Sequence, residues 1–478
     1  MRGMTKTTAT APVLGTRALN RATLGRQLLL RRSPLSAKAA VEHLLGLQAQ
    51  NVKPPYYALA ARLDGFTPEE LSGLMADREV VRIVTMRSTI HTHTAADALT
   101  LRPLVQPARD RELTNFRRGL VGVDLERLAA LARDLVEAEP RTMKQLRDAL
   151  QTEWPDADPQ ALAIAARCKL PLVQVTPRGL WGRSGQVALT TAEHWLGRGP
   201  AARPATPTAT SPAETAPGTA ASAATAPAPG MPFAEGVPST SAAAIPPAGG
   251  EPAETASAVT PSGVAASAET APPSDVPFAE GVPSAETASA VTAPGAASSA
   301  ASAPAPGAGA APAPDATVLR YLAAFGPASV KDMQTWAGLT RLREAFERLS
   351  PQLVTFRDER GVELFDLPEA PRPDADTPAP PRFLPEFDNL LLSHADRTRV
   401  VPAEYWGRSW VGNQAYCTFL VDGFLAGVWR LAEGALVIEP FGTLTKAQRA
   451  DLAEEGVRML DTMHPGSSYD IRFGTVVA

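Results

Sequence analysis

The chain has 478 residues and a formal net charge of −4 at pH 7, from 46 basic and 50 acidic side chains. It is long enough for several domains with buried cores. Its two cysteines, Cys168 and Cys417, lie far apart without CxxC spacing, which excludes a disulfide scaffold or a thiolate zinc site and fits a reducing cytoplasm. The N-terminus lacks the apolar core of a signal peptide. No stretch approaches the roughly 18 apolar residues of a membrane span, so we expect a cytoplasmic protein without a membrane partner.

Residues 199–315 differ from the rest of the chain in composition. Nearly all are Ala, Pro, Ser, Thr, Gly or Val, and one basic residue, Arg203, stands against nine acidic ones, a net charge of −8. Without apolar periodicity this segment predicts a disordered linker. The remainder of the chain then carries +4, a sign that suits a polyanionic partner but is too small to prove one.

The first folded segment, 17–100, predicts a winged helix, which is a helix-turn-helix variant with a β-hairpin. Helices are expected near 18–30 and 36–48. A third begins at "TPEEL", where Thr67 and Glu70 have capping-box spacing. The strand-like stretch "VVRIVTMRSTIHTHT" follows.

The segment 101–198 repeats this order and predicts a second winged helix. Its helices are "LERLAALARDLVEAEP", "TMKQLRDALQ" and "DPQALAIAARCK", and "LPLVQVTPRGLWGRSGQVALT" predicts two strands around a glycine-rich turn. In that turn Arg178 and Arg183 flank Trp181 among glycines that allow close backbone approach, which suits contact with DNA phosphates or bases. The alternative is that Trp181 covers the core of the domain.

After the linker, 316–371 predicts a third winged helix. Two helices close at Gly326 and Gly338, a third carries an apolar stripe, and "LVTFRDERGVELFDL" predicts a hairpin that turns at Gly361. The segment 380–478 alternates as strands do and predicts a small sheet or barrel-like domain before a final helix. The fold class is therefore α+β, with three tandem winged helices, a long disordered insert and a β-rich C-terminal domain.

Basic residues on the expected recognition helices are candidate DNA contacts. They are Arg167 and Lys169 in the second segment and Arg341 and Arg343 in the third. A solvated charged face explains any one of these residues equally well. The fold alone does not decide between DNA and protein partners, because winged helices serve both.

A pair of glutamines, Gln48 and Gln50, stands where the apolar pattern still points inward. Gly46 weakens a helix at this point, and Pro54-Pro55 bars its continuation. If the chain becomes extended from Gln48 onward, the two side chains share a side and their carboxamides converge. Such amides are costly to bury unless something satisfies them. The alternative is that they cap the end of the helix and bond the following loop.

Other polar residues are weaker candidates. His91 and His93 have a spacing that a metal site could use, but no partner motif accompanies them, so we expect a structural or DNA-contacting role, no metal and no cofactor. Asp388 could serve as an alternative catalytic base, although Asp388 and Asn389 more simply order the junction before the β-rich domain. The motifs GxxxxGK[ST], HExxH and GxSxG do not occur.

Four stretches together resemble a bacterial family of winged-helix DNA-binding proteins, which includes the azinomycin-resistance type of DNA glycosylases that unhook interstrand crosslinks. They are "LLGLQAQNVKPP", "MRSTIHTHTAAD", "LPLVQVTPRGLWG" and "FLPEFDNLLLSHADRTRVVP". The resemblance covers 18–198 and 316–478. The glutamine–apolar–glutamine motif of the family's glycosylases matches Gln48-Ala49-Gln50 position by position.

This resemblance implies a monofunctional DNA glycosylase with Gln48 and Gln50 as catalytic residues. It would hydrolyse the N-glycosidic bond of N7-alkylguanine, including bulky or crosslinked adducts, and leave an abasic site. Arg87 and His91 match the family's signature and would line the DNA cleft. The implied partner is double-stranded DNA with alkylated guanine, bound by a monomer in the cytoplasm at the nucleoid. Two other classes stay open: a non-catalytic winged-helix regulator that binds DNA, and a protein–protein scaffold.

Overall fold

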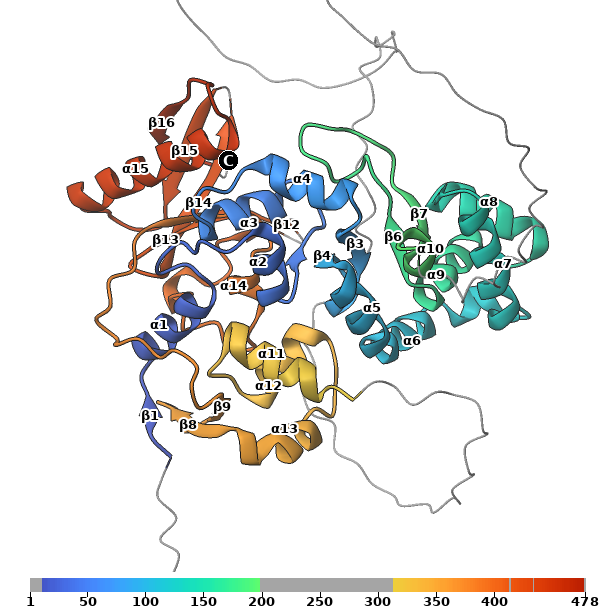
Figure 1. The fold of residues 1–478 in the computed structure, drawn as a ribbon, viewed down its shortest axis with the longest axis horizontal. Helices are drawn as coiled ribbons and strands as arrows, with labels where there is room; N and C mark the ends of the chain where they lie inside the picture. Colours follow the sequence, from blue (N-terminus) through green and yellow to red (C-terminus); the bar gives the residue numbers. More distant parts are fainter. Residues whose placement is uncertain (1–10, 198–312, 412–413, 433, 477–478) are drawn as a thin grey trace, which may run out of the picture. The chain divides into compact units, whose positions relative to one another are not determined.

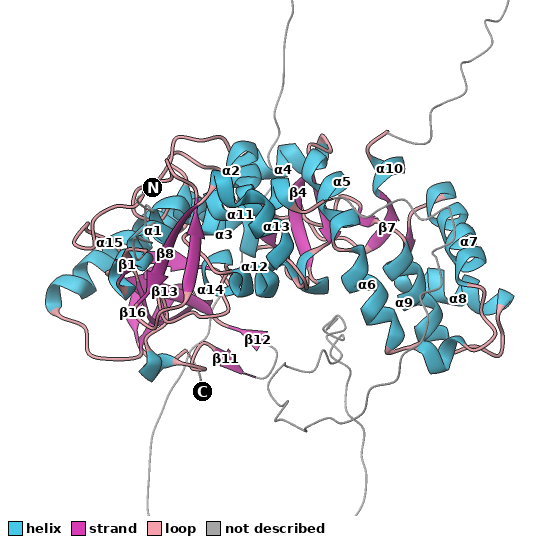
Figure 2. Ribbon diagram, turned by 90° about the horizontal axis from the view of Figure 1, so that it is seen from below, coloured by secondary structure: helices cyan, strands magenta, loops and turns pink. Residues whose placement is uncertain are grey.

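The computed structural model describes residues 11–197, 313–411, 414–432 and 434–476. These residues form helices and four sheets, so the fold is a mixed α+β one (Figure 2). The expected linker lies outside the described residues except for its last three positions. Within the described ranges, no helix is long and apolar enough to cross a membrane.

The N-terminal segment alternates short strands with helices (Figure 1). Its elements are β1 (Val13–Leu14), α1 (Thr16–Arg26), α2 (Ala37–His43), β2 (Leu47–Gln48), α3 (Pro54–Arg62), α4 (Pro68–Ala76), β3 (Val80–Val84), the 3-10 turn η1 (Met86–Ser88) and β4 (Ile90–Thr94). Ser36 caps α2 by accepting from the backbone N–H of Ala39.

The following segment packs three helices, α7 to α9, into a core of its own. Its elements are α5 (Ala95–Leu104), α6 (Gln106–Thr114), η2 (Arg117–Leu120), α7 (Leu125–Ala138), β5 (Arg141–Thr142), α8 (Met143–Glu153), α9 (Pro159–Lys169), β6 (Leu172–Gln174), β7 (Ala188–Thr191) and α10 (Ala192–Trp195). Helix α7 buries Leu128, Ala132 and Val136, which share one face at a spacing of four residues. Strands of both segments form one six-stranded sheet in the order β2-β4-β3-β6-β7-β5.

The chain beyond the undescribed stretch begins with three helices and a hairpin and then becomes rich in strands. Its elements are α11 (Asp315–Phe325), α12 (Val330–Ala337), α13 (Arg343–Leu349), η3 (Ser350–Gln352), β8 (Val354–Asp358), β9 (Glu363–Asp366), β10 (Arg382–Leu384), α14 (Asn389–Leu392), η4 (Ala403–Tyr405), β11 (Trp410–Val411), β12 (Gln414–Ala415), β13 (Cys417–Val421), β14 (Phe424–Ala432), β15 (Ala435–Pro440), α15 (Lys446–Met463) and β16 (Asp470–Phe473). The N-terminal strand β1 pairs in parallel with β8 and extends the hairpin to three strands.

The C-terminal sheet corrects the expectation of a barrel-like domain. Its order is β10-β13-β14-β15-β16, and among the described residues the two edge strands do not pair, so the sheet is open. Helix α15 crosses back so that β16 runs parallel to β15. Residues of α15 and α3, such as Leu452 and Leu59, bury the same core as Phe383, Phe419 and Trp429 of the sheet. Helices therefore cover the apolar surface that closure into a barrel would have buried.

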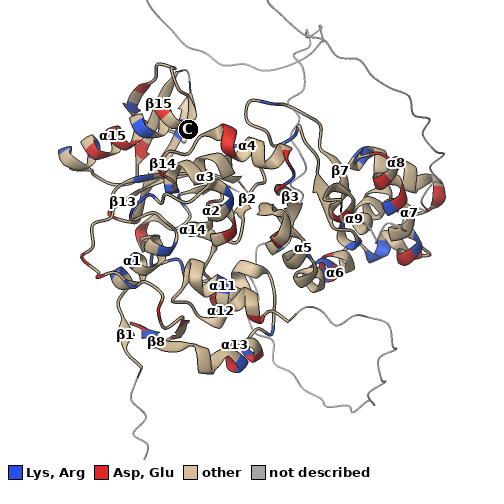
Figure 3. Ribbon diagram, in the orientation of Figure 1, with Lys and Arg blue, Asp and Glu red and all other residues tan. Residues whose placement is uncertain are grey.

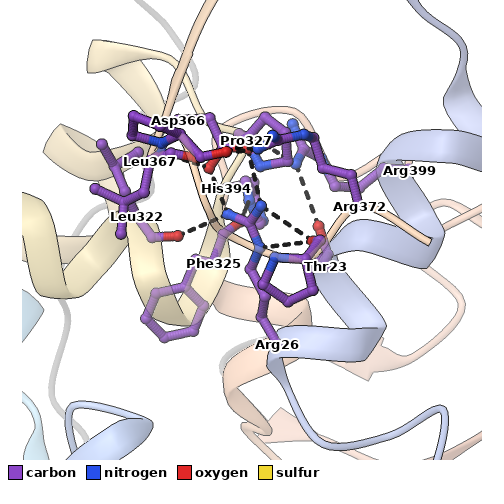
Figure 4. Close-up of polar contacts among 12 residues, drawn as sticks. Thr23, Arg26, Leu322, Phe325, Pro327, Asp366, Leu367, Arg372, His394 and Arg399 are labelled. Atoms are coloured by element: carbon purple, nitrogen blue, oxygen red, sulfur yellow. Dashed lines mark hydrogen bonds and ion pairs between the residues drawn. The ribbon is translucent and has the colours of Figure 1, made fainter. Parts of the chain in front are cut away.

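A cluster of buried polar contacts ties the N-terminal helix α1 to the later part of the chain (Figure 4). The Arg26 guanidinium donates to both carboxylate oxygens of Asp366, at 2.6 and 2.8 Å, and both side chains are buried. Arg372 donates to the same carboxylate at 2.6 Å. Arg399 donates to the Pro327 carbonyl at 2.8 Å. Because two guanidinium groups share one carboxylate, the pairing compensates the desolvated Asp366 charge.

We expect Asp366→Ala to lower the free energy of unfolding by about 3–5 kcal/mol, because it leaves the Arg26 charge buried without a partner. Asp315→Ala is the matched control, since Asp315 pairs with Arg348 at 2.5 Å on the surface, where such pairs contribute about 1 kcal/mol or less. Urea denaturation of both variants measures the difference. Equal losses would contradict a central role for the Asp366 cluster.

Candidate active site

The turn between α2 and β2 places the glutamine pair. Helix α2 ends at His43, earlier than the expected 36–48, because Leu45 and Gly46 adopt positive φ angles of 55° and 86°. A Cβ at Gly46 would lie 2.3 Å from the ring of His93, so only glycine fits there. The chain then enters β2, and the motif is extended rather than helical.

Gln48 lies inside the protein with its carboxamide oxygen engaged. Its backbone pairs with His91 across β2 and β4, and the residue is 6% exposed. The Oε1 atom accepts a hydrogen bond of 2.7 Å from Nη2 of Arg87. Its amide nitrogen donates to no other described residue, so it stays available to a ligand.

Arg87 is held in place by a neutral histidine and a neighbouring helix. It has a positive φ of 54° and donates to the Trp336 carbonyl at the end of α12. Its Nη2 lies 3.4 Å from Nε2 of His91. Because a guanidinium only donates, Nε2 accepts, and the proton is on Nδ1, which donates to the Thr89 carbonyl at 3.0 Å. Burial and the Arg87 charge hold the pKa of His91 well below its ordinary value of 6.5, so this imidazole is neutral.

Gln50 faces solvent but is fixed at its oxygen and along its backbone. Its Oε1 accepts from the Ile90 backbone N–H at 2.8 Å. The buried Arg82 donates to the carbonyls on either side, Ala49 at 2.9 Å and Asn51 at 3.3 Å. Burial, with a smaller contribution from the charge of the nearby Arg178, lowers the pKa of Arg82 to about 10. The loop is thus rigid while its glutamine side chain stays exposed.

Residues beyond the linker complete this loop, and Asp388 is a structural residue among them. Asp388 accepts from both Nη atoms of Arg62, at 2.7 and 2.8 Å, and both side chains are fully buried. A carboxylate that is fully buried and already bonded to a guanidinium cannot reach a substrate proton, so Asp388 is not suited to act as a catalytic base. Its neighbour Asn389 donates to the carbonyls of Gly46 at 2.7 Å and Leu44 at 3.3 Å, which fixes the turn into β2.

Glu386 is a carboxylate near the motif that the sequence did not single out. It accepts from the amide of Asn51, next to Gln50, and from Nε2 of Gln414 at 3.2 Å. It therefore bridges the glutamine loop to β12. Burial raises the pKa of its carboxyl above the ordinary value, and the hydrogen bond from Asn51 opposes that rise. No pattern links residues 51 and 386, which are 335 positions apart.

The two carboxamides are therefore held differently. The Gln48 side chain is buried and bonds Arg87, whereas the Gln50 side chain is exposed and bonds the backbone N–H of Ile90. Each carbonyl oxygen accepts one hydrogen bond and keeps a second lone pair, and each amide nitrogen keeps its donors. Such a pair can position a water molecule and a polar group of a substrate without changing its charge.

The expected DNA contacts lie in different surroundings. Arg87 and His91 lie beside Gln48. His91 is only 1% exposed, so DNA cannot contact it directly. Arg183 and Arg341 are exposed and make no side-chain contact within the described ranges. Three others are in ion pairs: Arg167 with Glu112, Lys169 with Glu126, and Arg343 with Glu363. Acidic and basic residues indeed intermix over α7, α8 and α13 (Figure 3).

Trp181 and Arg178 lie in the loop between β6 and β7, which packs back on the N-terminal segment. The Trp181 ring lies 5.0 Å from that of Tyr56 and 6.2 Å from that of Tyr57. Its backbone N–H donates to Ser72 at 2.7 Å. Arg178 donates to the Gly185 carbonyl at 3.3 Å within the loop. Trp181 is half-buried, so at most part of its ring could reach DNA.

The part of the chain that the structure describes holds no group of three or more His, Cys, Asp or Glu that could bind a metal ion. His93 is buried and neutral, with its pKa lowered to about 4 by burial, and its Nε2 bonds Thr85 at 2.9 Å. The two histidines are therefore buried side chains of strand β4.

Comparison with known proteins identifies the family to which the chain belongs. The family described as DNA glycosylase AlkZ-like matches residues 41–237 and 254–462. The match spans most of the sequence, so the chain belongs to the AlkZ-like DNA glycosylase family.

Among solved structures, the DNA glycosylase AlkZ of Streptomyces sahachiroi has a similar fold. The TM-score is 0.61 at 16% sequence identity, and the match covers 97% of this chain and 100% of that one. At this identity the likeness concerns the fold. No curated protein sequence matches the chain significantly.

Gly179 and Gly182 test the placement of Arg82. Both have positive φ, 104° and 67°, but a Cβ at Gly179 would lie 2.7 Å from Cδ of Arg82, whereas nothing lies within 4 Å at Gly182. We expect Gly182→Ala to cost about 1–2 kcal/mol from backbone strain. Gly179→Ala should cost about 1–3 kcal/mol more, from overpacking against Arg82 and from a φ angle outside the left-handed α region. Urea denaturation compares them, and equal losses would show that Arg82 moves aside freely.

The substitution Glu386→Gln tests whether burial of the charged Glu386 carboxylate destabilises the folded protein. Because its pKa is raised in the folded protein, the folded state binds this proton more tightly than the unfolded state does. The contribution of Glu386 to stability therefore falls as pH rises from its ordinary pKa of 4.5 through the raised value. We expect the variant to melt above wild type near neutral pH, with the gain disappearing toward acid pH. A lower melting temperature at neutral pH would contradict this.

Proposed function

We propose that this protein is a DNA repair glycosylase that hydrolyses the N-glycosidic bond of N7-alkylguanine, including bulky or crosslinked adducts, and leaves an abasic site. The observation that carries the proposal is the rigid, extended Gln48-Ala49-Gln50 loop, which keeps one carboxamide buried and fixed and the other exposed. Membership of a DNA glycosylase family supports it.

Amides suit this leaving group. N7-alkylguanine carries a positive charge, so the electron pair of the bond between N9 and C1′ returns to the ring and neutralises it as that bond breaks. The enzyme then has to hold a water molecule against C1′, where the new C–O bond forms, and to stabilise the cationic sugar. The proton of the water passes to solvent. A neutral amide performs these tasks although it is a poor base.

The exposure of Gln50 supports activity on large lesions. A glycosylase that acts on a flipped base encloses it in a tight pocket, and a crosslinked base cannot be flipped. The Gln50 side chain faces solvent rather than such a pocket. We therefore assign it the water-positioning role and give Gln48, oriented by Arg87, the supporting role. A single product, an abasic site without strand cleavage, follows from hydrolysis by water alone.

We further propose that 17–100, 101–198 and 316–371 act as three winged helices on double-stranded DNA and that 380–478 is the accompanying β-rich domain. Three helices followed by a hairpin in α11–α13 and β8–β9 support this for the last of them. Arg183 and Arg341, exposed and free of ion pairs within the described ranges, are the proposed phosphate contacts. The protein would act as a monomer on cytoplasmic, nucleoid DNA.

The test measures abasic-site formation in a duplex with N7-methylguanine. We expect Gln50→Ala to slow excision on the order of 100-fold, the usual effect of removing one group that stabilises a transition state, with DNA affinity nearly unchanged. Gln48→Ala should slow it less, and Gln352→Ala, an exposed glutamine in η3, should not. Normal DNA binding without excision, on this and a bulkier adduct, would instead favour a regulator. Equal loss of binding and excision in Gln50→Ala would refute its role.

A further inference from the structure

Arg397 is a half-buried arginine without an acceptor. It lies in the turn after α14, and its guanidinium makes no hydrogen bond or ion pair with any residue that the structure describes. The ring centroid of Trp406 lies 5.9 Å from its Cζ. The Trp406 side chain is itself 54% exposed, so this face of the protein is open.

The nearby carboxylates are already engaged. Asp396, the preceding residue, pairs with Arg360. Asp332 accepts from the Ala395 backbone N–H at 2.9 Å and from Ser329 at 2.8 Å. His394 is buried and neutral, since burial lowers its pKa to about 3. The carboxylates of Asp396 and Asp332 are thus engaged by other groups, and neither forms an ion pair with Arg397 among the described residues.

A second cation, Arg87, adds to the uncompensated positive charge at Arg397. The charge of Arg397 is close enough to Arg87 to lower its pKa, in addition to the larger effect of burial. Within the described ranges Arg87 donates to neutral groups: the carboxamide of Gln48, the imidazole of His91 and a backbone carbonyl. Two like charges without a counterion destabilise a folded protein, and such conflicts are expected at functional sites.

We propose that Arg397, with the charge of Arg87 behind it, forms a binding site for a phosphate group beside Gln48, and that its occupant is a backbone phosphate of duplex DNA. The inference rests on the proposed function and adds a contact to it. Arg397 supplies the planar fork of donors that suits phosphate oxygens, whereas the donors of Arg87 are largely used. A phosphate bound here fixes the DNA strand relative to the glutamine that Arg87 orients.

The first arm of the test uses inorganic phosphate on the full chain. Phosphate stabilises folded proteins generally, so we expect it to raise the melting temperature of every variant above that in chloride at equal ionic strength. The rise should be smaller in Arg397→Gln than in wild type or in Arg430→Gln, a variant at an exposed position of β14. In chloride Arg397→Gln should melt at or above the wild-type temperature, because it relieves repulsion. If it melts lower in chloride, Arg397 is a structural residue and the site is overturned.

The second arm measures affinity for an undamaged duplex against salt. Loss of one phosphate contact should weaken binding and reduce the slope of log K against log salt by about one. Arg430→Gln, at an exposed position of β14, is the matched control and should change neither as strongly. An unchanged slope in Arg397→Gln would overturn the assignment to DNA, even if free phosphate binds.

Neither experiment depends on base excision, so the phosphate site and the proposed glycosylase activity can be refuted independently. A protein that excises N7-methylguanine, but in which Arg397→Gln changes neither the response to phosphate nor the salt slope, is a glycosylase without this site. A protein that shows both effects but excises nothing retains the site and loses the proposed catalysis.

Discussion

The position of the glutamine loop depends on the fully buried ion pair between Arg62 and Asp388. The pair is bidentate, and Arg62 also donates to the Ala58 carbonyl at 3.0 Å, so the desolvated charges are well compensated. It holds the start of α14 against α3. Asn389, the next residue, is thereby placed to bind the turn into β2. A contact between positions 326 apart in sequence thus fixes the local geometry of the motif.

Buried arginines extend this principle along the chain. Arg26, Arg82 and Arg399 each reach carbonyls or carboxylates of distant segments. The turns at these points expose carbonyl oxygens that no sheet or helix satisfies, and a guanidinium with five donors can satisfy several at once. Part of the positive charge outside the linker is therefore used inside the fold. The net charge of the chain is consequently a poor guide to its DNA-binding surface, and individual unpaired arginines are a better one.

Local pattern predicted much of the fold, and long-range contact decided the rest. The helix end at Gly338 and the hairpin turn at Gly361 follow from backbone conformations that glycine allows, with φ angles of 70° and 81°. The extended course of the chain at Gln48 was foreseeable from Gly46 for the same reason. The open C-terminal sheet was not, because whether a sheet closes depends on which helices cover it. Neither Asn389 nor Arg397 carries a local signal, since their roles lie in partners gained or missing after folding.

The different surroundings of the two glutamines suit them to different roles in the proposed reaction. Arg87 withdraws electron density from the Gln48 carbonyl, which strengthens its amide N–H groups as donors, and the neutral His91 keeps that guanidinium oriented without cancelling its charge. A buried, polarised donor is suited to orient a polar group of the substrate. Among the described residues, the Gln50 side chain bonds only the Ile90 backbone N–H. Its oxygen keeps a second lone pair and it faces solvent, so it can accept from a water molecule. If a phosphate binds at Arg397, it offsets the positive charge beside Gln48 as the sugar becomes cationic, so the site would favour the transition state most when DNA is in place.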